Sequence, residues 1–198
     1  NVPMQPNEKF QLQGIVLTIH LKEMPELKER FAPQDLVAIF EMYTLESIAV
    51  LNSLPNCLDI NPMGDMICTL FSAHSQEQVD AVLLNALTLS LTVAHINEIL
   101  KAHGPHSIKV GIGASYGILW MTPFEYERMW LGSIPYESRE LSLLANEGFY
   151  NEEMMISNSF YEFLSPEIKE YLKENKLFSR NHSCNCYHGH YSLPEEEV

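Results

Sequence analysis

Residues 57–71 read CLDINPMGDMICTLF, with two short apolar segments on either side of Gly64-Asp65. A Gly-Asp step between two such segments is typical of a tight turn that joins antiparallel strands. The stretch therefore predicts a β-hairpin with strands at 57–60 and 66–71, joined by the polar residues 61–65.

Upstream of this hairpin, the sequence predicts one strand and one helix. Residues 14–21, GIVLTIHL, are rich in β-branched side chains, as expected for a buried strand. Residues 32–36, APQDL, have the pattern of a helix start, because a proline in the first turn has no N–H that the helix would need. This helix should end at Leu54-Pro55.

Downstream of the hairpin, residues 75–78 (SQEQ) predict a capping box that opens a long helix. No residue between Asp80 and Glu98 is charged. The run is short for a membrane span, which needs about 20 apolar residues. We therefore expect a helix buried on most of its circumference, in the domain core or in a dimer interface. The remaining expected elements are strands at 107–113, 114–120 and 154–156 and helices at 136–146 and from 165.

The element order and the hairpin predict an α+β fold of the ferredoxin-like (palm) type. Its sheet would be mixed and mostly antiparallel, with helices on one face. The chain of 198 residues shows no internal repeat. We expect a lead-in or linker at 1–13, one domain at 14–176, and a C-terminal strand or tail at 177–198.

The formal net charge of −14 makes nucleic acid and anionic membrane surfaces poor partners. The sequence shows no signal peptide, so we expect its four cysteines to be reduced thiols and the protein to be cytoplasmic. We also expect no membrane insertion by this segment. The chain starts at Asn1, which leaves open that it is part of a longer protein.

In their order along the chain, these segments resemble the catalytic domain of class III adenylate and guanylate cyclases. The resemblance covers about 150 residues and rests on the joint order of several short motifs. Their counterparts here are residues 15–21, 32–36, 63–67, 110–113 (VGIG) with Gly117, 130–141 (WLGSIPYESREL) and 158–164 (NSFYEFL).

The resemblance implies attack of a ribose 3′-hydroxyl on the α-phosphorus of a nucleoside triphosphate. In this family two aspartates hold two divalent cations, an asparagine and an arginine act on the ribose and the transition state, and a lysine and an aspartate read the purine. This sequence departs from that set at most positions. The metal aspartates fall on His20 and Asp65, the purine-reading pair on Asn61 and Met129, the asparagine on Tyr136 and the arginine on Glu140, with Ser133 in the same pocket.

We therefore expect a catalytically degenerate domain that acts in signalling by dimerisation, with itself or another cyclase-like chain, or by binding a partner or ligand. It would need no cofactor, and Mg²⁺ or Mn²⁺ would matter only if residual cyclase activity exists. Two alternatives stay open: an active cyclase that makes a cyclic nucleotide and pyrophosphate from ATP or GTP at a rearranged site, and a small-molecule sensor that uses the old nucleotide pocket. Whether the chain is an enzyme is therefore open, and its ligand and partner are unidentified.

Aromatic residues near the expected interface, Trp130, Tyr136 and Phe149, favour association, as does the charge-free helix. These side chains could instead fill the core of a monomer.

Two possible metal sites also follow from the residue types. His20 and Asp65 could share Zn²⁺ or Mn²⁺, which accept imidazole, or simply be hydrogen-bonded in the structure. The C-terminal residues His182, Cys184, Cys186, His188 and His190 would share one face of an extended strand. Neighbours at that spacing lie about 6.6 Å apart, so a zinc site would need a bend, and the alternative is an edge strand or tail.

Overall fold

The structure is a computed structural model that describes residues 9–104, 106–124, 127–147, 153–181 and 186–189. Its strands are β1 (Phe10–Leu21), β2 (Cys57–Met63), β3 (Met66–Ser72), β4 (Val110–Phe124), β5 (Glu127–Leu131), β6 (Met154–Ser157), β7 (Phe178–Asn181) and β8 (Cys186–Gly189). Its helices are α1 (Met24–Arg30), α2 (Pro33–Leu51), α3 (Gln76–Lys101), α4 (Ser133–Leu144), α5 (Asn158–Phe163) and α6 (Pro166–Glu174).

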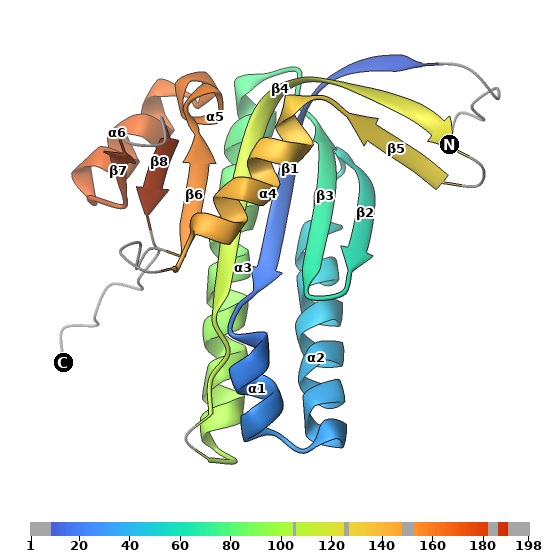
Figure 1. Cartoon of the computed structure of the whole chain (residues 1–198). Coiled ribbons are helices and arrows are strands. Elements are labelled where there is room, and N and C mark those ends of the chain that lie inside the picture. Colours follow the sequence, from blue (N-terminus) through green and yellow to red (C-terminus); the bar gives the residue numbers. More distant parts are fainter. Residues whose placement is uncertain (1–8, 105, 125–126, 148–152, 182–185, 190–198) are drawn as a thin grey trace.

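The described strands form one sheet in the order β2-β3-β1-β4-β6-β8-β7, and β5 pairs with β4 (Figure 1). Strands β4 and β6 run parallel, and the other pairs are antiparallel. The predicted fold class, an α+β fold with a mixed and mostly antiparallel sheet, is confirmed. The hairpin is also confirmed, with Met63 opposite Met66 and a two-residue turn at Gly64-Asp65.

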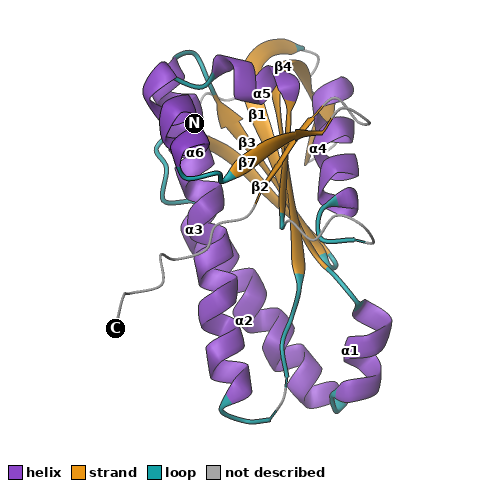
Figure 2. Ribbon diagram, turned by 90° about the vertical axis from the view of Figure 1, so that its left-hand side faces the viewer, coloured by secondary structure: helices purple, strands orange, loops and turns teal. Residues whose placement is uncertain are grey.

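Helices cover both faces of this sheet, so the expectation of helices on one face is wrong. Figure 2 shows α3 and α6 on one side of the sheet and α4 on the other. Alternate residues of β1 face the two layers: Leu17 belongs to the large core that contains α3, whereas Val16 packs with Ile134 of α4. Because both faces are covered, residues 15–19 are wholly buried.

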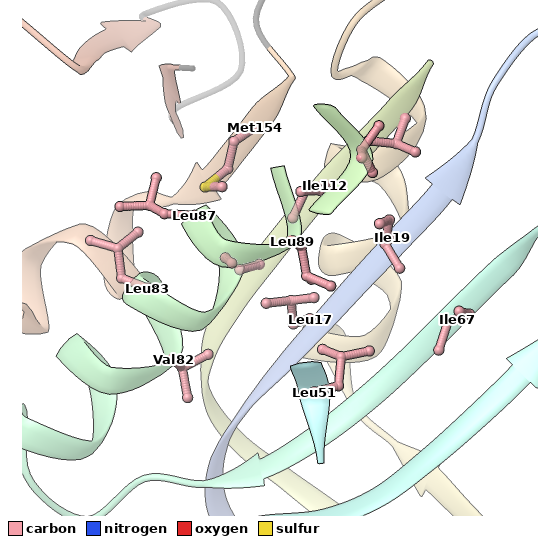
Figure 3. Packing of buried hydrophobic residues seen from close by; sticks show 14 of the residues in the cluster. Leu17, Ile19, Leu51, Ile67, Val82, Leu83, Leu87, Leu89, Ile112 and Met154 are labelled. Atoms are coloured by element: carbon pink, nitrogen blue, oxygen red, sulfur yellow. The ribbon is translucent and has the colours of Figure 1, made fainter. Parts of the chain in front are cut away.

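The large core lies between the sheet and helices α2 and α3. Figure 3 shows how leucine, isoleucine and valine side chains from α2, α3 and the central strands meet there. Helix α3 begins as predicted, with the Ser75 side chain accepting a hydrogen bond from the Gln78 N–H. By length and composition α3 could cross a membrane, but 56% of its apolar window is buried inside the protein. That burial supports its interpretation as a core helix.

Two strands expected at 107–113 and 114–120 are in fact the single strand β4. Its pairing with β1 continues without a break from Val110 to Met121. The sequence patterns did not predict strand β5 or helix α1. Strand pairing extends beyond residues 14–176 on both sides, because Phe10–Gln13 pair with β4 and β7 and β8 follow β6 in the sheet.

Helix α4 lies directly on the backbone of β4, and two glycines permit this contact. A Cβ atom added at Gly113 would lie 2.1 Å from the Ser138 carbonyl oxygen, and one at Gly111 would lie 2.2 Å from that of Ser142. The Ser138 hydroxyl donates to the Gly113 carbonyl oxygen at 3.0 Å. No other residue type fits at either glycine without moving the helix.

A carboxyl group lies at the entrance to β6. The Glu153 carbonyl oxygen accepts a hydrogen bond from the Ile112 N–H at 2.8 Å, which ties this residue to β4. Burial raises the pKa of the Glu153 carboxyl to about 7.

We predict that Gly113→Ala lowers the free energy of unfolding by about 3 kcal/mol, because the added methyl group must push α4 away from β4. Gly64→Asn is the matched control. Gly64 has φ 64° with open space around it, and asparagine tolerates that conformation, so the control should change stability by less than about 1 kcal/mol. Urea denaturation measures both. Equal effects of the two substitutions would contradict the proposed contact.

Candidate functional site

The candidate site lies where β1 ends beside the hairpin turn. His20 is the penultimate residue of β1 and pairs with Met66 of β3 and Gly111 of β4. The next residue, Leu21, donates its N–H to the Asp65 carbonyl oxygen at 2.8 Å. This hydrogen bond fixes the turn against the strand end. By alternation His20 faces the same layer as Val16 and Thr18, which is the layer of α4.

The structure brings His20 and Asp65 together. The distance from Nε2 of His20 to Oδ2 of Asp65 is 3.3 Å, and because a carboxylate only accepts, the imidazole donates this bond. Burial, and then the positive charge of Lys22, lower the pKa of His20, while Asp65 acts in the opposite direction. Nδ1 of His20 is buried and has no hydrogen-bond partner among the described residues. The pair therefore behaves as a neutral imidazole bonded to a carboxylate.

Lys22 supplies a cation to this site. Its Nζ atom donates to the Leu143 carbonyl oxygen at 2.5 Å and lies 3.7 Å from Oε2 of Glu147. The side chain is only 8% exposed, and burial lowers the pKa of Lys22. Leu143 is in the last turn of α4. That turn has no basic residue of its own, so Lys22, the residue after β1, caps the helix.

These residues do not fit the two divalent cations that the resemblance to class III cyclases implies. Mg²⁺ prefers hard anionic oxygens, and among the described residues Asp65 is the one carboxylate hydrogen-bonded to His20. The Lys22 ammonium adds a repulsive positive charge nearby. For the softer metals, His20 and Asp65 are two donors, and the described residues contain no cluster of three or more metal-ligating side chains.

The chain that follows His20 is also poorly suited to a polyphosphate. Helix α1 has Pro25 in its first turn, which removes an N–H group, and Glu26 in the same turn adds a negative charge. Glu23 precedes the helix and its carboxylate lies 2.6 Å from Nζ of Lys109. An anion approaching this end of α1 would meet carboxylates instead of free N–H groups.

Among the described residues, no hydrogen bond or ion pair joins the other predicted pocket residues to the His20–Asp65 pair. Asn61 is exposed on β2, and Met129 is 41% exposed on β5. Ser133, Tyr136 and Glu140 are exposed on α4, and Tyr136 is 67% exposed, so it fills no cavity within one copy. Arg139 is exposed as well.

The sequence interpretation missed Lys22 and its partner Glu147. Lys22 follows His20 by two residues and so shares its face of the chain, which is a signal the sequence did contain. Its acceptor, a carbonyl of α4, could be identified only from the packing of that helix.

The C-terminal cluster is described only in part. Cys186 and His188 lie on one face of β8, with Cys186 opposite Ser157 and His188 opposite Met155. Cys186 is 1% exposed and packs with Leu141, Ala145 and Met155. His182, Cys184 and His190 lie outside the described residues.

Exposed apolar side chains gather on β4 and β5. Trp120 pairs with Leu131, and these two residues, with Ile118 and Met129, are 41–56% exposed. Trp130 alternates with Met129 and Leu131 and points to the other side, where its Nε1–H donates to Asp59 at 3.1 Å. Phe149 lies outside the described residues.

Comparisons with known proteins agree with this geometry at the level of the fold. No protein-family model matches the chain. A curated protein named uridylate cyclase, from Gulbenkiania mobilis, is 21% identical over 166 residues, which is 76% of this chain and 64% of that protein. The chain thus spans 64% of the length of the curated relative it matches.

Solved structures of cyclase domains superpose well. The adenylyl cyclase CyaB from P. aeruginosa matches with a TM-score of 0.75 and 13% identity, covering 95% of this chain and 98% of that one. A class III adenylyl cyclase-like ATP-binding protein from Pseudomonas aeruginosa matches with a TM-score of 0.69 and 17% identity, covering 84% of this chain and 38% of that one. The resemblance to class III cyclases is therefore confirmed: the chain has the fold of their catalytic domains.

We predict opposite changes in the pKa of His20 when its two charged neighbours are removed. Lys22→Met removes a positive charge and should raise this pKa, whereas Asp65→Asn removes the hydrogen-bonded carboxylate and should lower it further. Proton NMR of the imidazole during a pH titration measures both. Lys109→Met, which removes an exposed ammonium paired with Glu23, is the control and should leave His20 unchanged. Shifts of the same sign in the two variants would contradict the geometry.

Proposed function

We propose that this chain is a cyclase-like domain without cyclase activity, which acts in the cytoplasm by association with a second cyclase-like chain. The observation that supports the proposal most is the His20–Asp65 hydrogen bond beside the Lys22 ammonium group, at positions where the resemblance implies two metal-binding aspartates. The free thiols Cys57 and Cys68 fit a reducing compartment.

The magnitude of the expected loss supports an inactive domain. Removing one preorganised group that stabilises a transition state costs roughly 10²–10³ in rate. Here a metal ligand, the ribose-orienting asparagine and the arginine are replaced together, by His20, Tyr136 and Glu140. Glu140 also places a negative charge where a triphosphate would need a positive one. Arg139, the exposed cation next to Glu140, could replace at most the arginine and not the metal ligand or the asparagine.

A second candidate, an active nucleotide cyclase, is favoured by one residue and one relative. Asp65 is retained at the hairpin turn, and the curated relative is named a uridylate cyclase, so the base that such an enzyme would use is open. If active, the domain would depend on Mg²⁺ or Mn²⁺. The third candidate is a small-molecule sensor that uses the old nucleotide pocket.

We predict no detectable cyclic nucleotide from ATP, GTP, CTP or UTP with either Mg²⁺ or Mn²⁺. The purified chain would be incubated with each triphosphate, and the products separated by chromatography with mass detection. Asp65→Ala is the control. Product that disappears in this variant would refute the proposal, whereas product that persists would identify a contaminating enzyme.

The association surface is proposed to include α4 and the β4–β5 hairpin. Helix α4 carries the exposed Tyr136, and β4 carries the exposed Trp120. The β4–β5 hairpin extends from the end of the sheet near which α4 begins (Figure 1). Exposed aromatic residues are enriched in protein interfaces. Helix α3 offers less support than expected, since most of its apolar window is buried.

We predict that the chain forms a dimer at micromolar concentration and that Tyr136→Ala weakens it about tenfold or more, because aromatic anchors often contribute over 1 kcal/mol. Tyr171→Ala is the matched control: Tyr171 is 45% exposed but belongs to α6, on the other face. Analytical ultracentrifugation gives both dissociation constants. A monomer at all concentrations would exclude the homodimer, and equal weakening by both variants would exclude this surface.

A further inference from the structure

A cavity separate from the cyclase site lies at the end of the molecule where α1, α2 and α3 meet. It has a volume of about 470 Å³, within the range of small-molecule sites, roughly 300–1,000 Å³. In Figure 1 this is the lower end, where the last turn of α3 lies near α1 and the first turns of α2. The described residues that line it are Phe31, Asp35, Ala38, Ile39, Met42, Ile99, Leu100, His103 and His106.

The walls of this cavity are mostly apolar. Ile39 and Leu100 are buried at its base, whereas Ile99 is 39% exposed at its edge. Part of the Ile99 side chain therefore remains exposed to solvent, and a ligand that covered it would bury additional apolar surface. Met42 adds a flexible apolar side chain that can adapt to different shapes.

One rim of the cavity is held in place by an aromatic contact. The rings of Phe31 and His106 lie with centroids 4.5 Å apart at 51°. The His106 ring also folds back over Gly104, where an added Cβ atom would lie only 2.8 Å from Nε2. Gly104 has φ 147°, a conformation that suits glycine. The rim is therefore largely formed before any ligand binds.

The cavity holds a carboxylate and a helix C-terminus that attract a cation, and these are opposed by the partial positive charge of the α2 N-terminal turn in which Asp35 lies. Asp35 is the one charged side chain among the described lining residues, and it forms no ion pair with any of them. The nearest part of α3 is its C-terminal end, which carries a partial negative charge, and Lys101 there is already paired with Glu98 at 2.7 Å. The formal net charge of −14 adds a general attraction for cations.

We propose that this cavity binds a small amphipathic organic cation, an amine carried on an alkyl or aryl body. The apolar body lies against Ile39, Ile99 and Leu100, and the ammonium group lies at the Asp35 carboxylate. The Phe31 ring offers a further face for the cation. The site uses no residue of the cyclase pocket, so it stands or falls independently of the proposed function.

The test compares three probes that share one tail: octylamine, octanol and octanoate, each titrated calorimetrically into the full chain below its micelle concentration. Octylamine should bind about fivefold more tightly than octanol, as expected for a partly exposed ion pair, and octanoate should bind most weakly. Asp35→Asn should reduce the octylamine affinity to that of octanol. Ala38→Leu should weaken both probes at least about tenfold by filling the cavity.

Helix α2 provides matched controls three turns further along. Glu46→Gln and Ala49→Leu repeat the same chemical changes at exposed positions that do not line the cavity, and both should bind octylamine like the unaltered chain. Circular dichroism confirms that each variant is folded. The proposal is overturned if octylamine binds no better than octanol, or if its affinity survives Ala38→Leu or falls equally in Ala49→Leu.

Discussion

The direct contact between α4 and the backbone of β4 determines how the rest of this molecule is arranged. It requires the absence of side chains at Gly111 and Gly113, and it brings two serine-rich turns of the helix against the sheet. Ser138 bonds both Thr18 of β1 and the Gly113 carbonyl, so the helix is attached to two strands at once. A side chain at either glycine would lift the helix and with it the second layer of the protein.

The position of α4 also sets the chemistry at the end of β1. Because the helix ends directly above this strand, its last carbonyls are within reach of Lys22. The Cε atom of Lys22 would lie 2.6 Å from a Cβ at Gly111, so the same glycine that admits the helix also admits the lysine side chain. A buried ammonium group in this place stabilises the helix end and makes the neighbouring imidazole harder to protonate. The positive charge at this end of β1 is therefore the Lys22 ammonium group, and it is bonded to the end of α4.

The sequence allowed the fold class, the hairpin and the start of α3 to be predicted, because each depends on local patterns. The apolar run of β1 and the Gly-Asp turn need no knowledge of distant residues. The continuity of β4 was missed, since glycine and alanine near its middle read locally as a break, whereas in the structure the strand pairs with β1 from Val110 to Met121. At the site, His20 and Asp65 could be placed together by analogy with a known fold, and they lie 3.3 Å apart. The role of Lys22 could not be predicted, because it depends on the position of α4, which lies more than 100 residues later in the chain.

Glu153 has a consequence that concerns the folding equilibrium. Its carboxyl has a pKa of about 7 in the folded protein against 4.5 for the free group, so folding takes up a proton between these two values. The contribution of this group to stability is complete below pH 4.5 and is lost as the pH rises through about 7. In a chain with a formal charge of −14, each proton bound on folding also reduces internal repulsion. Mild acidification from pH 7.5 to pH 6 therefore favours the folded state through this one side chain.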